Sequence, residues 1–395
     1  MTRVGVGLST AETTEAAVVE ATARARSGLG REPADLVLVF LSPQHVGGAA
    51  DVIAHINESL APVCLAGCVA EGVIGLEREL EDGPGLAVWT ASLPGARIEP
   101  FHIDVVEEQD AIVLDGLPEL DDPQLVLLLA DPFGLPVMAV VDHLNEEYPG
   151  IPVVGGIATG AGRPGAQALI LDGEIYRRGA VGIGLADVAV EAVVSQGCAP
   201  LGTDAVITRA EGNVVLELAG RPALERLREM VGALSAEERQ LAAHGLLAGL
   251  VIDENKPEYG RGDFLMRGIL GADEDSGGIA IGEDVRVGQT LRFHARDAAT
   301  ASEDLRIALD ETVAERRPSP AGALLFSCNG RGRGMFDEAD HDSRALAEAL
   351  GAPALAGFFC GGEIGPVGSR SFLHGFTATM AIFHDRGQTG AGADS

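Results

Sequence analysis

Three segments of the chain repeat one order of apolar, proline and glycine residues. Each opens with a continuous apolar run, and a run without polar alternation predicts a strand that is buried on both faces. A helix-like stretch, a proline–apolar–glycine phrase and a glycine-rich loop follow each run. The runs begin at Leu36, Leu125 and Ala323, and the phrases occupy residues 61–67, 151–156 and 352–357.

Each repeat is long enough to hold a strand, a crossover helix and a second, parallel strand. Such units place helices against sheets, so the repeats predict an α/β fold. We expect layered sheets built from repeated strand–helix–strand units, in two intimately associated domains. Any α/β protein reuses strands, helices and glycine, but the phrase recurs together with its loop, which favours a true internal repeat.

The chain between the second and third repeats has a different pattern. Residues 205–218 indicate two strands, residues 222–234 a helix, and Ser235 with Glu238 has the spacing of a capping box before another helix. Residues 264–296 indicate a meander of strands. We therefore expect a first domain over residues 1–215, a second over residues 216–385 and a disordered, glycine-rich tail over residues 386–395.

The composition is typical of a globular protein, but acidic residues strongly outnumber basic ones. Hydrophobic residues make up 46% of the 395 residues and charged residues 22%. The 59 acidic and 28 basic residues give a formal charge of -31, which repels phosphate backbones and anionic lipid surfaces. We therefore expect neither a nucleic-acid partner nor a membrane partner.

Targeting and metal-binding signals are absent from the sequence. The first residues lack the apolar core of a signal peptide, and no apolar run reaches the roughly 20 residues that a membrane helix needs. These features predict a cytoplasmic protein. The five scattered cysteines do not make a disulfide framework, and zinc, calcium and nucleotide-triphosphate motifs are missing. We predict no metal site and interpret the cysteines as small buried side chains.

The third repeat carries the densest group of polar residues. The segment 327–336 (SCNGRGRGMF) follows a buried strand, and ligands of open α/β sheets bind beyond the carboxyl ends of strands. Glycines let backbone N–H groups turn toward a ligand, and an arginine holds a carboxylate through two parallel bonds. Asn329, Arg331 and Gly332 are therefore candidate ligand contacts. An ordinary exposed loop would show the same alternation of glycine and arginine.

A second candidate group lies where the third repeat ends. Glu363 follows Gly361 and Gly362, in a place where packing does not explain a carboxylate. Its functional interpretation is a partner for a ligand amine, and its structural alternative is a cap on nearby backbone N–H groups. His374 and Thr377 stand near the start of the last strand. The histidine is either a ligand contact or a hydrogen-bonded structural residue.

These segments resemble a known family. The C-terminal signature of the FIST family is similar to residues 326–332, 357–358, 361–366 and 373–377. Its upstream segment is similar to residues 293–298 with 303–305, and its N-terminal half to residues 65–75 with 92–95. Order and spacing match across residues 35–383. The chain has Gly375 and Phe376 where the family usually has a polar residue after the histidine.

The resemblance implies a paired FIST N and FIST C module in a stand-alone bacterial member of the family. Such a module is an intracellular sensory unit that binds small ligands such as amino acids. Some members bind haem and respond to nitric oxide. No kinase, methyl-accepting or cyclase domain accompanies the module in this sequence, so we expect signalling to need a separate protein partner.

We expect a sensory protein for a small polar metabolite such as an amino acid, without a cofactor. Arg331 would pair with the ligand carboxylate and Glu363 with its ammonium group, while Asn329 and His374 form hydrogen bonds. Residues 68–75 would form the opposite wall. Two alternatives stay open: a haem-binding gas sensor with His374 as axial ligand, and an enzyme of unknown reaction that uses the Glu363 and His374 region. Homo-oligomerisation also stays open.

Overall fold

The computed structural model describes residues 1–108, 111–314, 320–351 and 353–385. The chain forms two compact units. Unit 1 comprises Met1–Val194, Leu305–Leu373 and Thr377–Ser395, and unit 2 comprises Ser195–Asp304 and His374–Phe376. Most of unit 2 is therefore one long insertion in the chain of unit 1. The tail predicted over residues 386–395 lies outside the described residues.

The three sequence repeats form three strand–helix–strand units of unit 1, so the predicted α/β class is confirmed. In each, a helix joins two parallel strands. Their carboxyl ends consequently meet at one edge of the sheet. The units are β2 (Leu36–Leu41), α2 (Ala49–Leu60) and β3 (Cys64–Val69); β9 (Leu125–Ala130), α3 (Val137–Glu147) and β10 (Val153–Ile157); and β22 (Pro320–Cys328), α7 (His341–Leu350) and β23 (Ala354–Cys360).

Each repeat then contributes a β-hairpin to the sheet of another repeat. The hairpin of the first repeat pairs with β23, that of the second with β3, and that of the third with β10. The exchange passes once around the three repeats, so unit 1 has a pseudo-threefold topology. The hairpins are β4–β5 (Val73–Gly75, Arg78–Leu80), β11–β12 (Leu169–Leu171, Glu174–Tyr176) and β24–β25 (Glu363–Val367, Arg370–His374).

Two antiparallel strands complete each sheet beside the first strand of its repeat. Apart from β8 (Ala111–Asp115), which extends the second sheet, the strand order is the same in all three sheets. This shared order supports one repeated unit. The completing strands are β6 (Leu86–Ser92) and β1 (Arg3–Ser9) beside β2, β13 (Ala180–Ala186) and β7 (Arg97–Glu108) beside β9, and β26 (Thr377–His384) and β14 (Val190–Gln196) beside β22.

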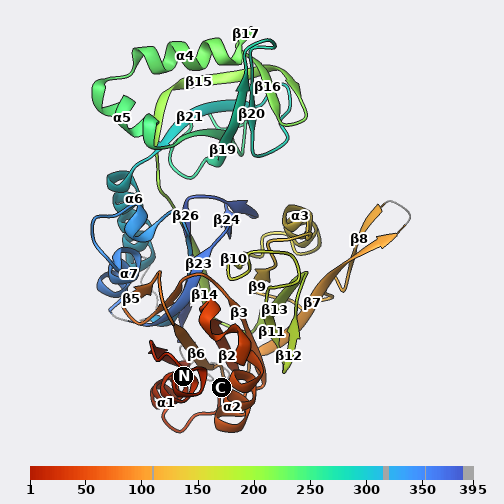
Figure 1. The fold of residues 1–395 in the computed structure, drawn as a ribbon, viewed down its shortest axis with the longest axis vertical. Helices are drawn as coiled ribbons and strands as arrows, with labels where there is room; N and C mark the ends of the chain where they lie inside the picture. Colours follow the sequence, from red (N-terminus) through yellow and green to blue (C-terminus); the bar gives the residue numbers. More distant parts are fainter. Residues whose placement is uncertain (109–110, 315–319, 352, 386–395) are drawn as a thin grey trace, which may run out of the picture. The chain divides into compact units, whose positions relative to one another are not determined.

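The three sheets share one apolar core. Each sheet turns one face into it, with Trp89 from the first sheet, Leu127 from the second and Phe326 from the third among the buried residues. Helices cover the opposite faces: α1 (Thr14–Leu29) and α2 the first, α3 the second, and α6 (Ala298–Ala314) with α7 the third. Figure 1 shows α1 and α2, in red and orange, beside the strands of the first sheet.

The repeated glycine marks the closest approach of the two parallel strands. A Cβ atom on these glycines would lie 1.7–2.0 Å from a carbonyl oxygen of the neighbouring strand, where no side chain fits. The pairs are Gly67 with Val39, Gly155 with Leu128 and Gly357 with Leu325. On its other side each glycine faces an isoleucine of the exchanged hairpin. The partners are Ile170 for Gly67, Ile364 for Gly155 and Ile74 for Gly357.

Unit 2 contains a closed antiparallel β-barrel. The order around it is β15 (Cys198–Glu211), β21 (Thr290–Arg296), β18 (Leu246–Val251), β19 (Phe264–Asp273), β20 (Gly278–Ile281) and β16 (Val214–Leu218), and β16 pairs back with β15. The strands and the helices α4 (Ala223–Ala233) and α5 (Ala236–His244) bury a common apolar core. The predicted capping box of α5 is confirmed, because Ser235 and Glu238 exchange side-chain-to-backbone bonds of 2.8 and 3.1 Å.

The barrel changes one detail of the sequence interpretation and leaves the expected domain boundary a prediction. Residues 264–296 are not a simple meander: β19 pairs with β20, but β21 lies between β15 and β18. The expected boundary between residues 215 and 216 falls inside β16, whereas the compact units change at residues 194–195 and 304–305. Among the described residues, no helix has the length and apolarity to cross a bilayer.

We expect Gly67→Ala and Gly155→Ala to lower the free energy of unfolding by about 1–3 kcal/mol or more, because each added methyl group forces the parallel strands apart. Urea denaturation of the purified chain measures the loss. Gly47→Ala is the control, since nothing lies within 4 Å of a Cβ atom there. Its effect should stay within about 0.5 kcal/mol. Wild-type stability in Gly67→Ala would contradict the close approach.

Candidate functional site

Most of the sequence-predicted residues of the third repeat lie at the carboxyl ends of β22 and β23. Asn329 and Arg331 follow β22, and Glu363 opens β24 directly after the loop that ends β23. The Asn329 N–H group donates to the Cys360 carbonyl at 2.9 Å, which joins the two loops. Thr377, at the start of β26, donates to Glu363 from its backbone and its hydroxyl group. These residues thus form one group, which we call the edge cluster.

Arg331 is fully buried, and its charge is matched within unit 1. Its Nε and Nη2 atoms donate to the two carboxylate oxygens of Asp342 at 2.7 and 2.8 Å. Its guanidinium also lies 5.2 Å from the ring centre of Phe336. Arg331 therefore already holds a carboxylate of the chain itself, in the two-bond geometry that the sequence suggested for a ligand.

Asp342 receives bonds from several neighbours. Besides Arg331, the Ser327 hydroxyl donates to it at 3.0 Å, and His341 Nδ1 lies 2.9 Å from its other oxygen. Burial alone would raise the pKa of Asp342, but the charge and hydrogen bonds of Arg331, with His341, hold that pKa below its usual value. Arg331 and Asp342 thus form a buried, ionised pair. Removing one partner of such a pair destabilises the fold strongly, because it leaves the other charge buried without a counter-charge.

The exchanged hairpins show that Glu363 is peculiar to the third repeat. Ile364, Ile74 and Ile170 occupy equivalent positions, because each faces the repeated glycine. The residue before each isoleucine is Glu363 in the third hairpin, but apolar Val73 in the first and Leu169 in the second. All three positions are buried. Only the third repeat therefore places an ionisable group there.

Burial decides the protonation state of Glu363. It raises the pKa of this carboxyl to about 8, although hydrogen bonds from Thr377 and Cys328 and the charge of Arg331 act in the opposite direction. Thr377 N and Oγ1 lie 3.0 and 2.9 Å from Oε2. At neutral pH most molecules therefore carry a neutral carboxylic acid at this position, which can donate as well as accept a hydrogen bond.

The glycine loops of the edge cluster bind other repeats. The Gly361 N–H group donates to the Ile157 carbonyl at 2.9 Å, and the Ile157 N–H group donates to the Gly362 carbonyl at 2.8 Å. Gly332 has a φ of +65°, and a Cβ atom there would meet the Glu81 carboxyl group. Backbone groups that were expected to face a ligand thus connect the repeats.

The first repeat lies against the edge cluster, on the side where the opposite wall was expected. Asn329 is exposed, and its Nδ2 atom lies 3.4 Å from Glu71 Oε2. The Phe359 N–H group donates to the Gly72 carbonyl at 3.0 Å. His374, the remaining sequence-predicted contact, belongs to unit 2, where it is 3% exposed.

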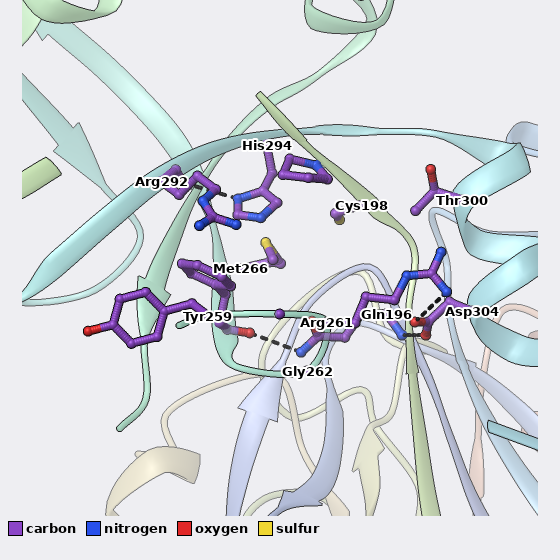
Figure 2. Close-up of a pocket in the computed structure, with 13 residues that line it drawn as sticks. Gln196, Cys198, Tyr259, Arg261, Gly262, Met266, Arg292, His294, Thr300 and Asp304 are labelled. Carbon is purple, nitrogen blue, oxygen red and sulfur yellow. Dashed lines mark hydrogen bonds and ion pairs between the residues drawn. The ribbon is translucent and has the colours of Figure 1, made fainter. Parts of the chain in front are cut away.

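A cavity of about 260 Å³ lies on the outer side of the barrel, within unit 2 (Figure 2). Phe293 and Ala295 belong to the barrel core, so the alternating Arg292 and His294 of the same strand point outward. Figure 2 shows these two on one side of the cavity and Arg261 with Asp304 on the other. The lining residues are Gln196, Cys198, Pro200, Tyr259, Gly260, Arg261, Gly262, Phe264, Met266, Arg292, His294, Thr300 and Asp304.

His294 is a neutral imidazole at the cavity wall. Burial lowers its pKa to about 4, so it carries no charge at neutral pH. Its Nδ1 atom lies 3.1 Å from the Arg292 carbonyl oxygen, which only accepts, so Nδ1 carries the hydrogen and Nε2 is an acceptor. A Cβ atom on Gly249 would lie 2.6 Å from the ring, so this glycine makes room for the imidazole.

The cations of the cavity are already paired, but not equally tightly. Arg292 binds Asp204 through bonds of 2.6 and 2.7 Å and stacks 4.8 Å from the ring centre of Phe264. Arg261 is more exposed and lies 3.2 Å from Glu303 and 3.6 Å from Asp304. The Arg261–Asp304 contact is longer than the Arg292–Asp204 bonds and is therefore the weaker ion pair.

Two protein-family domains match the chain: the FIST N domain over residues 35–221 and the FIST C domain over residues 223–366. The chain belongs to the FIST family. FIST domains are generally sensory domains of signal transduction proteins. The FIST C match includes most of the cavity residues, from Tyr259 to Asp304, and the edge cluster up to Glu363.

Similar proteins exist in mycobacteria. An uncharacterised protein of Mycobacterium tuberculosis H37Rv is 45% identical over 384 residues, which cover 97% of this FIST chain and 100% of the relative. An uncharacterised protein of Mycobacterium bovis is 44% identical over 97% of this chain and 99% of its own. A solved cyanuric acid hydrolase from A. caulinodans spans 98% of this chain and 100% of its own, at 10% identity and a TM-score of 0.28, which is too low to carry an argument.

Sequence reasoning missed the cavity, although a signal for it was present. Residues 293–298 and 303–305 carried part of the FIST resemblance, and they contain His294 and Asp304. Polar residues at alternate positions of a barrel strand point away from the core, so Arg292 and His294 could have been placed on one outer face. The loop around Arg261 gave no comparable pattern.

We expect Arg331→Ala to lower the free energy of unfolding by about 3–5 kcal/mol, because it leaves the Asp342 carboxylate buried without its partner. Chemical denaturation of the full chain measures this change. Arg333→Ala is the matched control: it removes an exposed arginine that pairs with Glu81 at 3.3 Å, and it should cost no more than about 1 kcal/mol. Similar losses for both variants would contradict the buried pair.

Glu363→Gln should change how stability depends on pH. A native pKa of about 8, against about 4.3 in the unfolded chain, means that the native state holds an extra proton between these values. The stability from this proton is fully present below about pH 4.3 and is lost as the pH rises through 8. The free energy of unfolding of wild type, relative to Glu363→Gln, should therefore fall across this window. A constant difference across the window would contradict a neutral Glu363.

Proposed function

We propose that this FIST protein is a sensor that binds a small polar metabolite of amino-acid size in the unit 2 cavity and passes the signal to a separate protein partner. The observation that carries the proposal is the cavity itself, which combines aromatic walls, a neutral histidine and a loosely paired arginine. A few well-placed polar groups in a mainly apolar pocket are typical of small-molecule sites.

The size of the cavity favours a small ligand. Its volume of about 260 Å³ lies below the roughly 300–1,000 Å³ of pockets that hold drug-sized ligands. A haem is larger than such a ligand, so the cavity favours a metabolite over the haem alternative. His374, the expected axial ligand, is not among the residues that line the cavity.

The charges of the cavity suit a zwitterion. Arg261 and Asp304 lie 3.6 Å apart, and a ligand with both a carboxylate and an ammonium group can insert between them and satisfy each with its opposite charge. An amino acid has this charge pattern. Asp304 also accepts hydrogen bonds from Ser195 and Gln196, and Arg261 also pairs with Glu303, so both residues stay partnered when their mutual contact opens.

The apolar part of the cavity would hold the ligand side chain. Phe264, Met266 and Tyr259 line it, and the neutral His294 presents an acceptor nitrogen on the same wall. Because the pKa of His294 is about 4, its state stays constant from about pH 5 to 8. Ligand binding should therefore not depend on this residue's titration in that range.

The edge cluster is the other location to consider, because the sequence predicted that Asn329 and Glu363 contact the ligand. Here Arg331 is occupied by Asp342, and Glu363 is neutral at pH 7, so neither offers an unmatched charge to a zwitterion. The charges therefore favour the cavity of unit 2.

A thermal-shift screen of free amino acids tests the proposal. At a concentration 100 times its Kd, a ligand stabilises the native state by about 2.7 kcal/mol, which raises the Tm by several degrees. We expect this shift for wild type and its loss in Arg261→Ala. Gly249→Val should reduce it as well, because the added side chain displaces His294.

Two further variants serve as controls. Arg221→Ala removes another exposed arginine of unit 2 that pairs with two carboxylates, away from the cavity, and it should respond like wild type. Asn329→Ala tests the edge cluster and should also keep the full shift. A ligand response that survives Arg261→Ala but disappears in Asn329→Ala would move the site to unit 1. If no amino acid stabilises wild type, the ligand class is wrong.

A further inference from the structure

The edge cluster contains two cysteines opposite each other on neighbouring strands. Cys328 ends β22, Cys360 ends β23, and the two are direct partners in the parallel register. Register partners on neighbouring strands lie about 4.8 Å apart, and their side chains leave the same face of the sheet. Disulfides form between residues whose Cα atoms are roughly 4.4–6.8 Å apart. The backbone therefore holds the two thiols within bridging range.

The two cysteines differ from their equivalents in the other repeats. Cys360 lies three positions after the repeated glycine, where the first two repeats have Ala70 and Ala158. Cys328 lies three positions after Leu325, the strand residue that faces this glycine. The equivalent positions hold Ser42 in the first repeat and Asp131 in the second. The facing pair of thiols is therefore confined to the repeat that also carries Glu363 and Arg331.

The surroundings assign different roles to the two thiols. Cys328 is half-buried, whereas the other four cysteines are buried. The Gly330 N–H group lies 3.4 Å from its sulfur and points to it as a donor, and the charge of Arg331 acts on it. Exposure decides which of the two thiols an oxidant in solution reaches first. Burial keeps the pKa of Cys360 well above its usual value, so Cys360 stays protonated and inaccessible.

We propose that Cys328 and Cys360 are an oxidant-responsive thiol pair, which hydrogen peroxide converts into an intramolecular disulfide. Peroxide reacts first at Cys328, and Cys360 resolves the product. The proposal does not depend on the ligand cavity, because all of its residues lie in unit 1. It gives the sensor a second, chemical input.

The reaction balances without a further reagent. The Cys328 thiolate attacks one peroxide oxygen, the O–O bond breaks, an S–O bond forms, and the departing hydroxide takes up the thiol proton as water. The Cys360 sulfur then attacks the Cys328 sulfur of this sulfenic acid. An S–S bond forms, the S–O bond breaks, and the hydroxyl leaves with the Cys360 proton as water. The two thiols lose two electrons, and one peroxide becomes two waters.

Thiol counting on the purified full-length chain tests the proposal. The protein is treated with hydrogen peroxide, denatured, alkylated and analysed by intact mass and peptide mapping. We expect two fewer alkylated cysteines than in untreated protein, a peptide containing residue 328 linked to one containing residue 360, and recovery with dithiothreitol. The product should run as a monomer on a non-reducing gel.

The repeats themselves suggest variants that fold. Cys360→Ala and Cys328→Ser introduce residues that the first repeat has at the equivalent positions. In Cys360→Ala, peroxide should stop at a Cys328 sulfenic acid that dimedone traps. In Cys328→Ser neither product should form. Cys64→Ala, which removes a buried cysteine elsewhere in unit 1, should behave like wild type.

Three outcomes would overturn the proposal. One is that Cys328 in the native protein alkylates no faster than Cys64. Another is that peroxide leaves Cys328 and Cys360 reduced at concentrations that oxidise an unfolded control of the same chain. The third is that the mapped disulfide joins two molecules, or involves Cys68 in place of Cys360.

Discussion

Unit 1 depends on a backbone contact that occurs once in each repeat. A glycine of the second strand lies so close to a carbonyl oxygen of the first that any side chain would collide. The same glycine faces an isoleucine of a hairpin from another repeat. One residue type therefore sets the spacing within a repeat and the register between repeats. This double constraint explains why a glycine recurs near the end of all three proline–apolar–glycine phrases, as Gly67, Gly155 and Gly357.

Against this uniform scaffold, Glu363 stands out, because it is a buried ionisable residue where the other two hairpins have Val73 and Leu169. Burying this carboxyl group costs free energy that the hydrogen bonds from Thr377 only partly recover, so packing alone gives no reason for it. Polar groups that weaken a scaffold at one of three equivalent places are typical of functional positions. The thiol pair occupies the same strand ends.

The sequence was sufficient for the α/β class and for the three strand–helix–strand units, because uninterrupted apolar runs and crossover helices are local patterns. The exchange of hairpins was not predictable in the same way. Nothing local distinguishes Val73–Gly75 pairing within its own repeat from pairing with β23, since the partner is chosen by packing of all three sheets. The barrel was missed for a related reason: β21 pairs with β15 and β18, which are distant in sequence.

For the candidate sites, the sequence shows which residue types are present, but the charge state and partners of these residues depend on the folded environment. The sequence brought Asn329, Arg331 and Glu363 together correctly, since strand ends of one sheet meet at one edge. It could not show that Asp342, on the following helix, neutralises Arg331, or that burial keeps Glu363 protonated. The cavity could not be found before the barrel, because His294 and Arg261 line one cavity only in the folded unit 2.

The hairpin exchange also bears on how such a chain could have arisen. Each repeat gives one hairpin and receives another, so no single repeat can complete its own sheet. Three separate copies of a one-repeat chain could satisfy the same pairings by swapping hairpins in a closed ring, as domain-swapped oligomers do. Fusing them into one polypeptide would free each copy to mutate independently. A symmetric trimer must carry every substitution three times, whereas this chain has Glu363 in one hairpin and the apolar Val73 and Leu169 at the equivalent positions of the other two.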